Sequence, residues 1–397
     1  AVGKWHLGDH PEFLPTNQGF DSYYGIPYSN DMWPSKTMKY ADDCLFREGQ
    51  SFQTLENAFA GELNRRGNPP AMQNKVPLMR DTECIEFPVD QSTITRRYAD
   101  EGIRFISESV KADKPFFLYL ANSMPHVPLF ASEQFMGKSE RGLYGDVIEE
   151  IDYSTGRILD HLKKLGVEEN TLVIFTSDNG PWLKKGDHAG SALPLFEGKF
   201  TAFEGGVRVP CVMNWPAQIP AGSICSEPAA TIDLYPTLAR LAGASLPDME
   251  LDGKNMLDLM TTKPGSKTPH KNLFFVYGKR AWSVRSGDWK YDAKMNFTTM
   301  GEGRSDEKAL YNLKEDIGET TNLIDDYPEV AERMADALDE HLRRIGIEIA
   351  DPDGSAPPPA ATSGNVENRS KRMGQKNRRA PIKEYRMSKA HFLLQNS

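Results

Sequence analysis

Apolar residues in the first 250 positions follow two patterns, helical spacing and short continuous runs. Helical spacing predicts amphipathic helices over 93–110 and 145–166, the second closed by Gly166. Continuous apolar runs predict buried strands over 114–121 and 171–180. Two buried strands separated by a long helix indicate a βαβ unit with parallel strands and a right-handed crossover.

The same pattern extends to a third strand over 207–215 and a covering helix over 231–243. The fold class predicted for this part is α/β, a doubly wound and mostly parallel sheet. Short strands with turn residues follow over 271–293, and a helix is predicted over 328–345. These later elements predict a smaller α+β domain of antiparallel strands and one helix.

Turn-forming residues between Gly253 and Pro269 separate the two patterns. We therefore expect an α/β domain over 1–262 and a small α+β domain over 263–350. Residues 351–397 combine a Pro- and Ala-rich stretch with basic residues and no sustained apolar face, which is typical of a disordered tail.

Charge and composition exclude several classes of function. The 397 residues contain 47 Lys and Arg against 56 Asp and Glu, a net charge of −9, which does not favour a nucleic-acid partner. No apolar run approaches the roughly 18 residues that a membrane span needs. Four widely spaced cysteines form neither a disulfide scaffold nor a zinc-binding pattern.

Polar residues directly after the predicted strands are the first candidates for chemistry, because ligands of open α/β sheets bind at the carboxyl ends of strands. His126 lies in a Pro-flanked loop after the first buried strand, and Asp178 and Asn179 follow the second. A carboxylate beside an amide carbonyl offers oxygen ligands, which suit calcium or magnesium better than zinc. Taken alone, Asp-Asn-Gly is commonly a turn, and His126 would be an ordinary loop histidine.

Further candidates lie in three short motifs, which are GKWHLG with Lys4 and His6, GDHAGS with His188, and FEGKFTAFEGGVRVP with Lys199. Each has an alternative explanation as a solvated surface residue, and a surface loop explains His188 about as well as a substrate pocket does. The combination of motifs distinguishes between these explanations.

Four motifs occur in the order found in the sulfatase family: GKWHLG (3–8), PHVPL (125–129), SDNGP (177–181) and GK…EGGVRVP (198–210). Over residues 1–345 the chain resembles a type I sulfatase of the arylsulfatase A group. The resemblance implies an alkaline phosphatase-like fold and the hydrolysis of aryl or carbohydrate sulfate esters. It also implies export to the periplasm or secretion.

The resemblance implies a role for each candidate. Asp178 and Asn179 match calcium ligands, with Ca²⁺ expected in preference to Mg²⁺, and Lys4 and Lys199 match lysines that hold the sulfate oxygens. Charge grows on the leaving oxygen during S–O cleavage, so a divalent cation and ammonium groups stabilise the transition state.

The histidines complete the implied site. His126 matches the histidine near the leaving oxygen, where an imidazole can protonate the departing alcohol. His6 matches the histidine that contacts a hydrated formylglycine, the nucleophile of the family. His188 is a candidate for contact with the substrate.

The sequence departs from the family in one essential feature. Formylglycine is made from a Cys in a C-x-P-S-R motif, and neither the four cysteines nor any Ser lies in that context. We therefore expect the nucleophile and the paired aspartates of the metal site to lie upstream of Ala1. The chain alone should then have no turnover, bind calcium weakly and aggregate. Phe200 is a smaller departure, at a place that relatives usually keep small.

Two alternatives remain open on the sequence. A phosphomonoester, phosphodiester or phosphonate hydrolase of the same superfamily would use a similar cation flanked by Lys and His. A non-catalytic relative would bind sulfated glycans without cleaving them. The sequence leaves the oligomeric state open.

Overall fold

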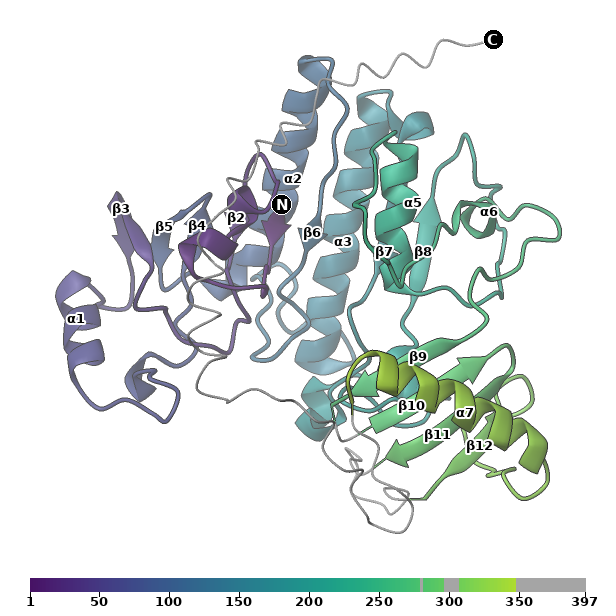
Figure 1. Ribbon diagram of the computed structural model, residues 1–397. Helices are drawn as coiled ribbons and strands as arrows, with labels where there is room; N and C mark the ends of the chain where they lie inside the picture. Colours follow the sequence, from purple (N-terminus) through teal and green to yellow (C-terminus); the bar gives the residue numbers. More distant parts are fainter. Residues whose placement is uncertain (279–280, 296–306, 348–397) are drawn as a thin grey trace. The chain divides into compact units, whose positions relative to one another are not determined.

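A computed structural model describes residues 1–278, 281–295 and 307–347, so the predicted basic tail lies outside the described residues. The chain forms two compact units (Figure 1). Unit 1 comprises Ala1–Ser177, Pro181–Ser191 and Pro210–Ala221, and unit 2 comprises Asp178–Gly180, Ala192–Val209 and the residues from Gly222 onward. The boundary placed at residue 262 from the sequence stays a prediction.

Unit 1 is built on a mixed six-stranded sheet in the order β3-β5-β4-β2-β1-β6. The strands are β1 (Val2–Gly3), β2 (Tyr24–Gly25), β3 (Lys39–Phe46), β4 (Leu78–Arg80), β5 (Glu83–Phe87) and β6 (Leu120–Ala121). Strand β1 is parallel to both of its neighbours, with Val2 opposite Tyr24 on one side and Leu120 on the other. The carboxyl ends of β1, β2 and β6 therefore meet at one edge of this sheet.

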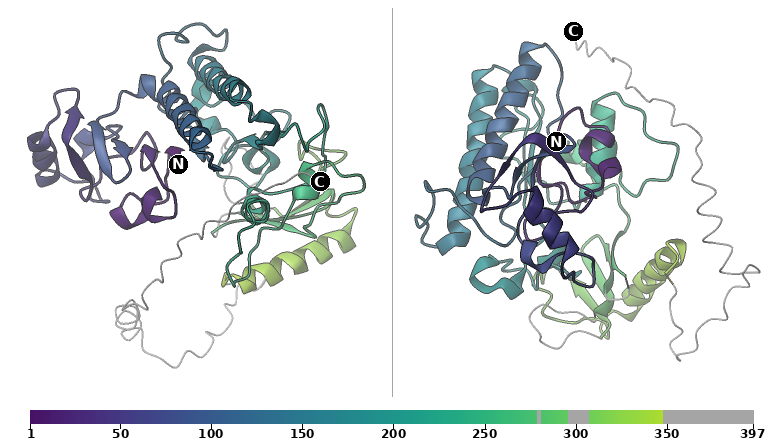
Figure 2. Two further views of the ribbon diagram at one scale, coloured as in Figure 1. Left: turned by 90° about the horizontal axis from the view of Figure 1, so that it is seen from above. Right: turned by 90° about the vertical axis from the view of Figure 1, so that its left-hand side faces the viewer.

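Two long helices lie side by side in unit 1, α2 (Ile94–Lys111) and α3 (Gly142–Lys164), as Figures 1 and 2 show. Their bounds confirm the helices predicted over 93–110 and 145–166. Both bury their apolar stripes in the same core, to which α2 contributes Ile94 and Tyr98 and α3 contributes Val147 and Ile151. The amphipathic spacing that predicted these helices is thus explained by this core.

A second, two-stranded sheet of unit 1 pairs β7 (Val173–Thr176) with β8 (Cys211–Asn214) in antiparallel orientation. Both strands fall within predicted ranges, but β7 does not pair with β6 in the part of the chain that the structure describes. The strand predicted over 114–121 is also shorter and less buried than expected, since Phe117 is 59% exposed and Tyr119 is 44% exposed. Among the residues that the structure describes, β6 pairs only with β1, so alternate side chains of the apolar run face solvent.

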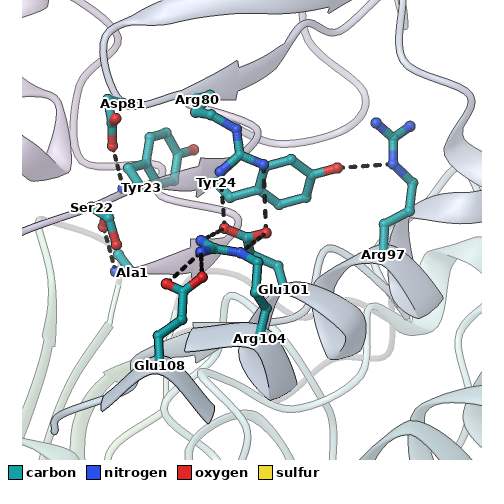
Figure 3. Close-up of polar contacts among 10 residues, drawn as sticks. All are labelled: Ala1, Ser22, Tyr23, Tyr24, Arg80, Asp81, Arg97, Glu101, Arg104 and Glu108. Carbon is teal, nitrogen blue, oxygen red and sulfur yellow. Dashed lines mark hydrogen bonds and ion pairs between the residues drawn. The ribbon is translucent and has the colours of Figure 1, made fainter. Parts of the chain in front are cut away.

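A salt-bridge network joins the sheet to α2 at the amino end of β1 (Figure 3). The guanidinium of Arg80 lies 4.7 Å from the centroid of the Tyr24 ring, and its Nη1 lies 3.0 Å from Glu101 Oε1. Arg97 Nε donates to the Tyr24 hydroxyl at 2.9 Å, and Arg104 binds Glu101 from the next turn of α2. The network lies at the amino end of β1, away from the carboxyl end of the strand where Lys4 follows.

The remaining elements of unit 1 are short. Helix α1 (Phe52–Ala60) begins with a capping box between Ser51 and Thr54. The 3-10 helices are η1 (Pro11–Phe13), η2 (Pro15–Asn17), η3 (Pro70–Met72), η4 (Gln91–Thr93), η5 (Glu168–Asn170) and η6 (Leu183–His188).

Unit 2 contains an antiparallel sheet in the order β12-β11-β10-β9, with α7 lying across it in Figure 1. The strands are β9 (Leu273–Tyr277), β10 (Ala281–Ser286), β11 (Trp289–Met295) and β12 (Ala309–Asn312), and the helices are α4 (Glu204–Val207), η7 (Thr231–Asp233), α5 (Leu234–Leu241), α6 (Leu257–Met260) and α7 (Pro328–Arg344). Leu338 and Leu342 of α7 pack with Val284 and Leu310 of the sheet. These elements confirm the small antiparallel region and the final helix predicted from the sequence.

Candidate functional site

The backbone of Lys4–His6 continues β1 at the carboxyl edge of the unit 1 sheet. The amide of Lys4 donates to Ala121 O at 2.7 Å, and the amide of His6 donates to Pro27 O at 3.0 Å. These bonds extend the pairing of β1 with both parallel neighbours by a few residues. They fix Lys4 and His6 just beyond the end of β1, a strand that the sequence analysis did not predict.

His126 lies at the same edge, in the loop that follows β6. Its Nδ1 lies 2.7 Å from Val127 O and 3.3 Å from Ser29 Oγ. The carbonyl can only accept, so this contact assigns a proton to Nδ1 and leaves Nε2 as the nitrogen that exchanges protons. Trp182 packs beside the imidazole at 5.9 Å between ring centroids.

Ser29 and Asn30 hold the His126 loop and were not among the predicted site residues. Asn30 is fully buried, and its Nδ2 donates to His126 O at 3.1 Å and to Pro128 O at 2.9 Å. Both residues follow β2, a strand of two residues that the sequence did not predict, so the rule about residues after strands did not reach them. His188 is exposed at the end of η6, and its contact with a substrate stays a prediction.

Asp178, Asn179 and Lys199 belong to unit 2, where two loops pack through glycines. The Gly180 amide donates to Gly206 O at 3.0 Å, which ties the Asp178–Asn179 loop to the segment after Lys199. A Cβ on Gly180 would lie 1.8 Å from Gly205 O, and one on Gly205 would lie 2.1 Å from Glu197 O. Only glycine permits this approach, which explains the Gly residues of both motifs.

Backbone strain is present at His6 and on both sides of Lys199. His6 has φ of 56°, Glu197 has φ of 60° and Phe200 has φ of 79°, a region that non-glycine residues rarely adopt. Such strain costs on the order of 1–3 kcal/mol per residue and is found where function needs a fixed geometry. Phe200 also lies against its neighbour, with its ring centroid 5.4 Å from Lys199 Nζ.

A buried ionic cluster supports the Lys199 loop within unit 2. Lys290 is fully buried, and its Nζ lies 2.7 Å from Glu319 Oε1 and 3.3 Å from Glu204 Oε1. Glu319 Oε2 in turn accepts the Glu204 amide at 2.7 Å, so the first turn of α4 is fixed to the rest of unit 2. No local sequence pattern indicates the cluster, because residues far apart in the chain meet there.

The cluster has one buried ammonium group for three buried carboxyl groups. Burial raises the pKa of Glu319 to about 7, although Lys290 opposes the shift. Burial also raises the pKa of Asp292. Burial alone would lower the pKa of Lys290, but Glu319, Glu204 and Asp292 outweigh it and hold that pKa above its ordinary value.

The candidate metal ligands are of the chemical type that calcium prefers. Asp178 and Asn179 offer a carboxylate and an amide oxygen, the hard ligands that calcium prefers, but calcium takes six to eight of them. Among residues 1–278, 281–295 and 307–347, no group of three or more His, Cys, Asp or Glu side chains is placed to hold a metal ion. Further ligands would have to come from elsewhere.

The chain does not fit a formylglycine. Cys44 and Cys84 lie in neighbouring strands with their Sγ atoms 3.9 Å apart, and Cys211 and Cys225 are exposed. None of the four has the sequence context from which formylglycine is made.

The described part of the chain has no helix that is long and apolar enough to cross a membrane.

The structure therefore brings the candidates together in two groups. Lys4, His6 and His126 share the edge of the unit 1 sheet, and Asp178, Asn179 and Lys199 share the glycine-packed loops of unit 2. The meeting of all six side chains in one pocket stays a prediction.

Comparison with known proteins identifies the family. The sulfatase family model matches residues 1–244, and the model of the C-terminal region of N-sulphoglucosamine sulphohydrolase matches residues 194–346. The dog N-acetylgalactosamine-6-sulfatase is 36% identical over 300 residues, covering 73% of this chain and 50% of that protein. Bovine arylsulfatase A is 34% identical over 361 residues, covering 85% of this chain and 66% of that protein. The chain thus spans between half and two thirds of these relatives.

A solved structure agrees in fold. Ps i-CgsB, which was also solved in complex with κ-ι-κ-neocarrahexaose, has a TM-score of 0.66 and 27% identity over 95% of this chain and 76% of that one. This similarity accounts for the mixed sheet and the antiparallel C-terminal region described above. Because the family model covers more than half of the sequence, this chain belongs to the sulfatase family.

Proposed function

We propose that the protein hydrolyses sulfate esters, with a carbohydrate or aryl sulfate as substrate. The observation that carries this proposal is the packing of Gly180 against Gly205 and Gly206, which joins the candidate cation ligands to the loop of a candidate sulfate-binding lysine. An anion between a divalent cation and an ammonium group is the arrangement that sulfate transfer requires.

Each side chain has a defined part in the proposed reaction. The ammonium groups of Lys4 and Lys199 bind the sulfate oxygens and neutralise the charge that grows on them. Asp178 and Asn179 would hold calcium, which supplies further charge neutralisation when it is bound. His126, with Nδ1 directed at Val127 O, presents Nε2 and can give its proton to the leaving oxygen.

The nucleophile is proposed to lie outside these 397 residues, since no Cys or Ser of the chain has the required context. The remaining calcium ligands are proposed to come from the same outside segment. A longer natural protein, here called the longer protein, would then carry the activity. Export of that protein to the periplasm or its secretion stays a prediction.

The absent nucleophile gives one alternative a specific basis. A relative without nucleophile would bind sulfated glycans through Lys4 and Lys199 and would not hydrolyse them. A Thr or Ser nucleophile upstream would instead indicate phosphoryl or phosphonate chemistry.

The test begins with the coding sequence upstream of Ala1, where we expect a C-x-P-S-R motif. The longer protein should then hydrolyse 4-nitrophenyl sulfate faster than 4-nitrophenyl phosphate. Replacement of Lys199 by Ala should lower kcat/KM by about a hundredfold. The matched control is Lys138→Ala, which changes an exposed lysine outside both groups. Binding of a sulfated sugar without turnover would support the binding-only alternative, and a preference for phosphate would overturn the proposal.

A further inference from the structure

Unit 1 contains an aromatic cavity that the proposed reaction does not use. The cavity has a volume of about 390 Å³ and lies between α1 and the segment that follows β2. Its walls include the rings of Tyr40, Phe52 and Phe59 and the polar side chains of Ser35, Lys36 and Glu56. This volume falls within the range of natural ligand sites, and the mixture of rings and polar groups is typical of them.

The ring of Phe52 is fixed in place and open to solvent. Phe52 is 51% exposed, and its ring packs edge-to-face on Tyr40 at 5.7 Å and on Phe46 at 4.9 Å between centroids. The capping box of Ser51 and Thr54 fixes the first turn of α1, where Phe52 is the first residue. A rigid, exposed ring loses little entropy when a ligand stacks on it.

The polar groups of the cavity are available to a ligand. Within the described residues, no hydrogen bond or ion pair involves the side chains of Lys36 or Glu56, and both are exposed. Lys36 can bind an anion, and Glu56 can accept hydrogen bonds from hydroxyl groups. A sugar ring has apolar C–H faces that stack on aromatic rings and hydroxyl groups at its rim, so a sulfated sugar matches this set.

A short segment of unit 1 connects the cavity to the carboxyl edge of the sheet, where His126 lies. Ser29 lies beside His126, and Lys36, at the cavity, is seven residues further along the chain. Seven residues span at most about 25 Å. An oligosaccharide is the class of ligand that can extend over a span of this size.

We propose that this cavity is a distal subsite that binds a second, non-reacting sulfated sugar of an oligosaccharide, with the ring on Phe52 and its sulfate on Lys36. This subsite rests on the proposed function only in that the reacting sulfate lies near His126. It makes the substrate an oligosaccharide sulfate rather than a small aryl sulfate.

Calorimetry on the longer protein tests the subsite through binding rather than through turnover. The probes are three sulfated hexasaccharides, of carrageenan, chondroitin sulfate and heparan sulfate, each with its desulfated counterpart. We expect at least one sulfated probe to bind, with Phe52→Ala weakening its affinity about tenfold. Lys36→Ala should weaken the affinity for the sulfated probe about fivefold and leave the affinity for the desulfated probe unchanged. Phe52→Trp should retain binding, which separates lost stacking from misfolding.

The control variants are Phe117→Ala and Lys138→Ala, which change an exposed aromatic ring and an exposed lysine elsewhere in unit 1. The subsite is overturned if no sulfated probe binds, if Phe52→Ala binds as tightly as the wild type, or if Lys36→Ala affects both forms equally. Hydrolysis of 4-nitrophenyl sulfate by the longer protein reports on the proposed function separately. If the wild type hydrolyses the ester but Phe52→Ala and Lys36→Ala bind the oligosaccharide as tightly as the wild type, the subsite alone is wrong. If these variants lose oligosaccharide binding but neither the wild type nor any variant hydrolyses the ester, the proposed function alone is wrong.

Discussion

The backbone amide of Gly180 donates a hydrogen bond of 3.0 Å to the carbonyl oxygen of Gly206. This bond joins two sequence motifs through residues that are 26 positions apart, and it holds the Asp178–Asn179 loop against the loop of Lys199. The position of the candidate calcium ligands within unit 2 therefore depends on a contact that admits no side chain.

Substitution of Gly180 by Ala should separate the two loops, because the added Cβ would lie 1.8 Å from Gly205 O. We expect kcat/KM of the longer protein for a sulfate ester to fall by about a hundredfold, since a small displacement of positioned groups has this effect. Gly156→Ala is the matched control, because a Cβ there meets nothing within 4 Å. Equal activity in the two variants would show that the contact does not position the site.

The role of His126 predicts a dependence on the leaving group. His126→Ala should lower kcat for a sugar sulfate, whose alkoxide needs a proton, by about a hundredfold or more. The loss should be several times smaller for 4-nitrophenyl sulfate, whose phenolate leaves without protonation. Steady-state kinetics with both substrates on the longer protein measure the difference. An equal loss on the two substrates would contradict proton donation by His126.

The sequence predicts the long elements of the fold and the residues after strands, but not what distant segments build together. Helices α2 and α3 follow from apolar spacing, His126 follows from its place after a predicted strand, and Lys4 follows only from its motif. Lys290 and Glu319 could not be found in this way, because a buried ion pair leaves no local pattern. The exposure of Phe117 was also missed, since an apolar run does not reveal whether its strand has a second neighbour.

The buried cluster of unit 2 predicts that stability falls as the pH rises. The folded chain raises the pKa of Glu319 to about 7 from an ordinary value of 4.5, so folding favours the protonated form. Its contribution is fully present below pH 4.5 and is lost as the pH rises through 7, by up to about 3 kcal/mol. Urea unfolding at pH 5 and pH 8 should show this loss, and Glu319→Gln should reduce it.

The control for that experiment is Glu315→Gln, which changes an exposed glutamate four residues away. It should leave the difference between pH 5 and pH 8 as in the wild type. If Glu319→Gln and Glu315→Gln behave alike, the pH dependence arises elsewhere in the chain.

The thiol pair of unit 1 predicts a selective oxidation. The hydrogen bond between Cys44 and Cys84 holds the pKa of Cys44 below its usual range, and the two Sγ atoms lie 3.9 Å apart. Oxidised glutathione should accept two electrons and become two thiols, while Cys44 and Cys84 lose their protons and form one disulfide. This disulfide should increase the free energy of unfolding by about 2–4 kcal/mol.

Peptide mapping by mass spectrometry measures the pairing, with Cys84→Ser as the control that should leave Cys44 joined to glutathione. Exposed Cys211 and Cys225 should carry glutathione instead of pairing with Cys44 or Cys84. A native, folded sample in which Cys44 and Cys84 stay reduced while the exposed pair reacts would contradict this prediction.

Turnover of sulfate esters by the longer protein is the measurement that tests the central claim most directly. Initial rates with 4-nitrophenyl sulfate and 4-nitrophenyl phosphate should be compared for the wild type, Lys4→Ala, Lys199→Ala and Lys138→Ala. We predict hydrolysis of the sulfate ester, a loss of about a hundredfold in each of the first two variants, and no loss in the third. A wild type that leaves the sulfate ester intact, or Lys4 and Lys199 variants as active as Lys138→Ala, would contradict it.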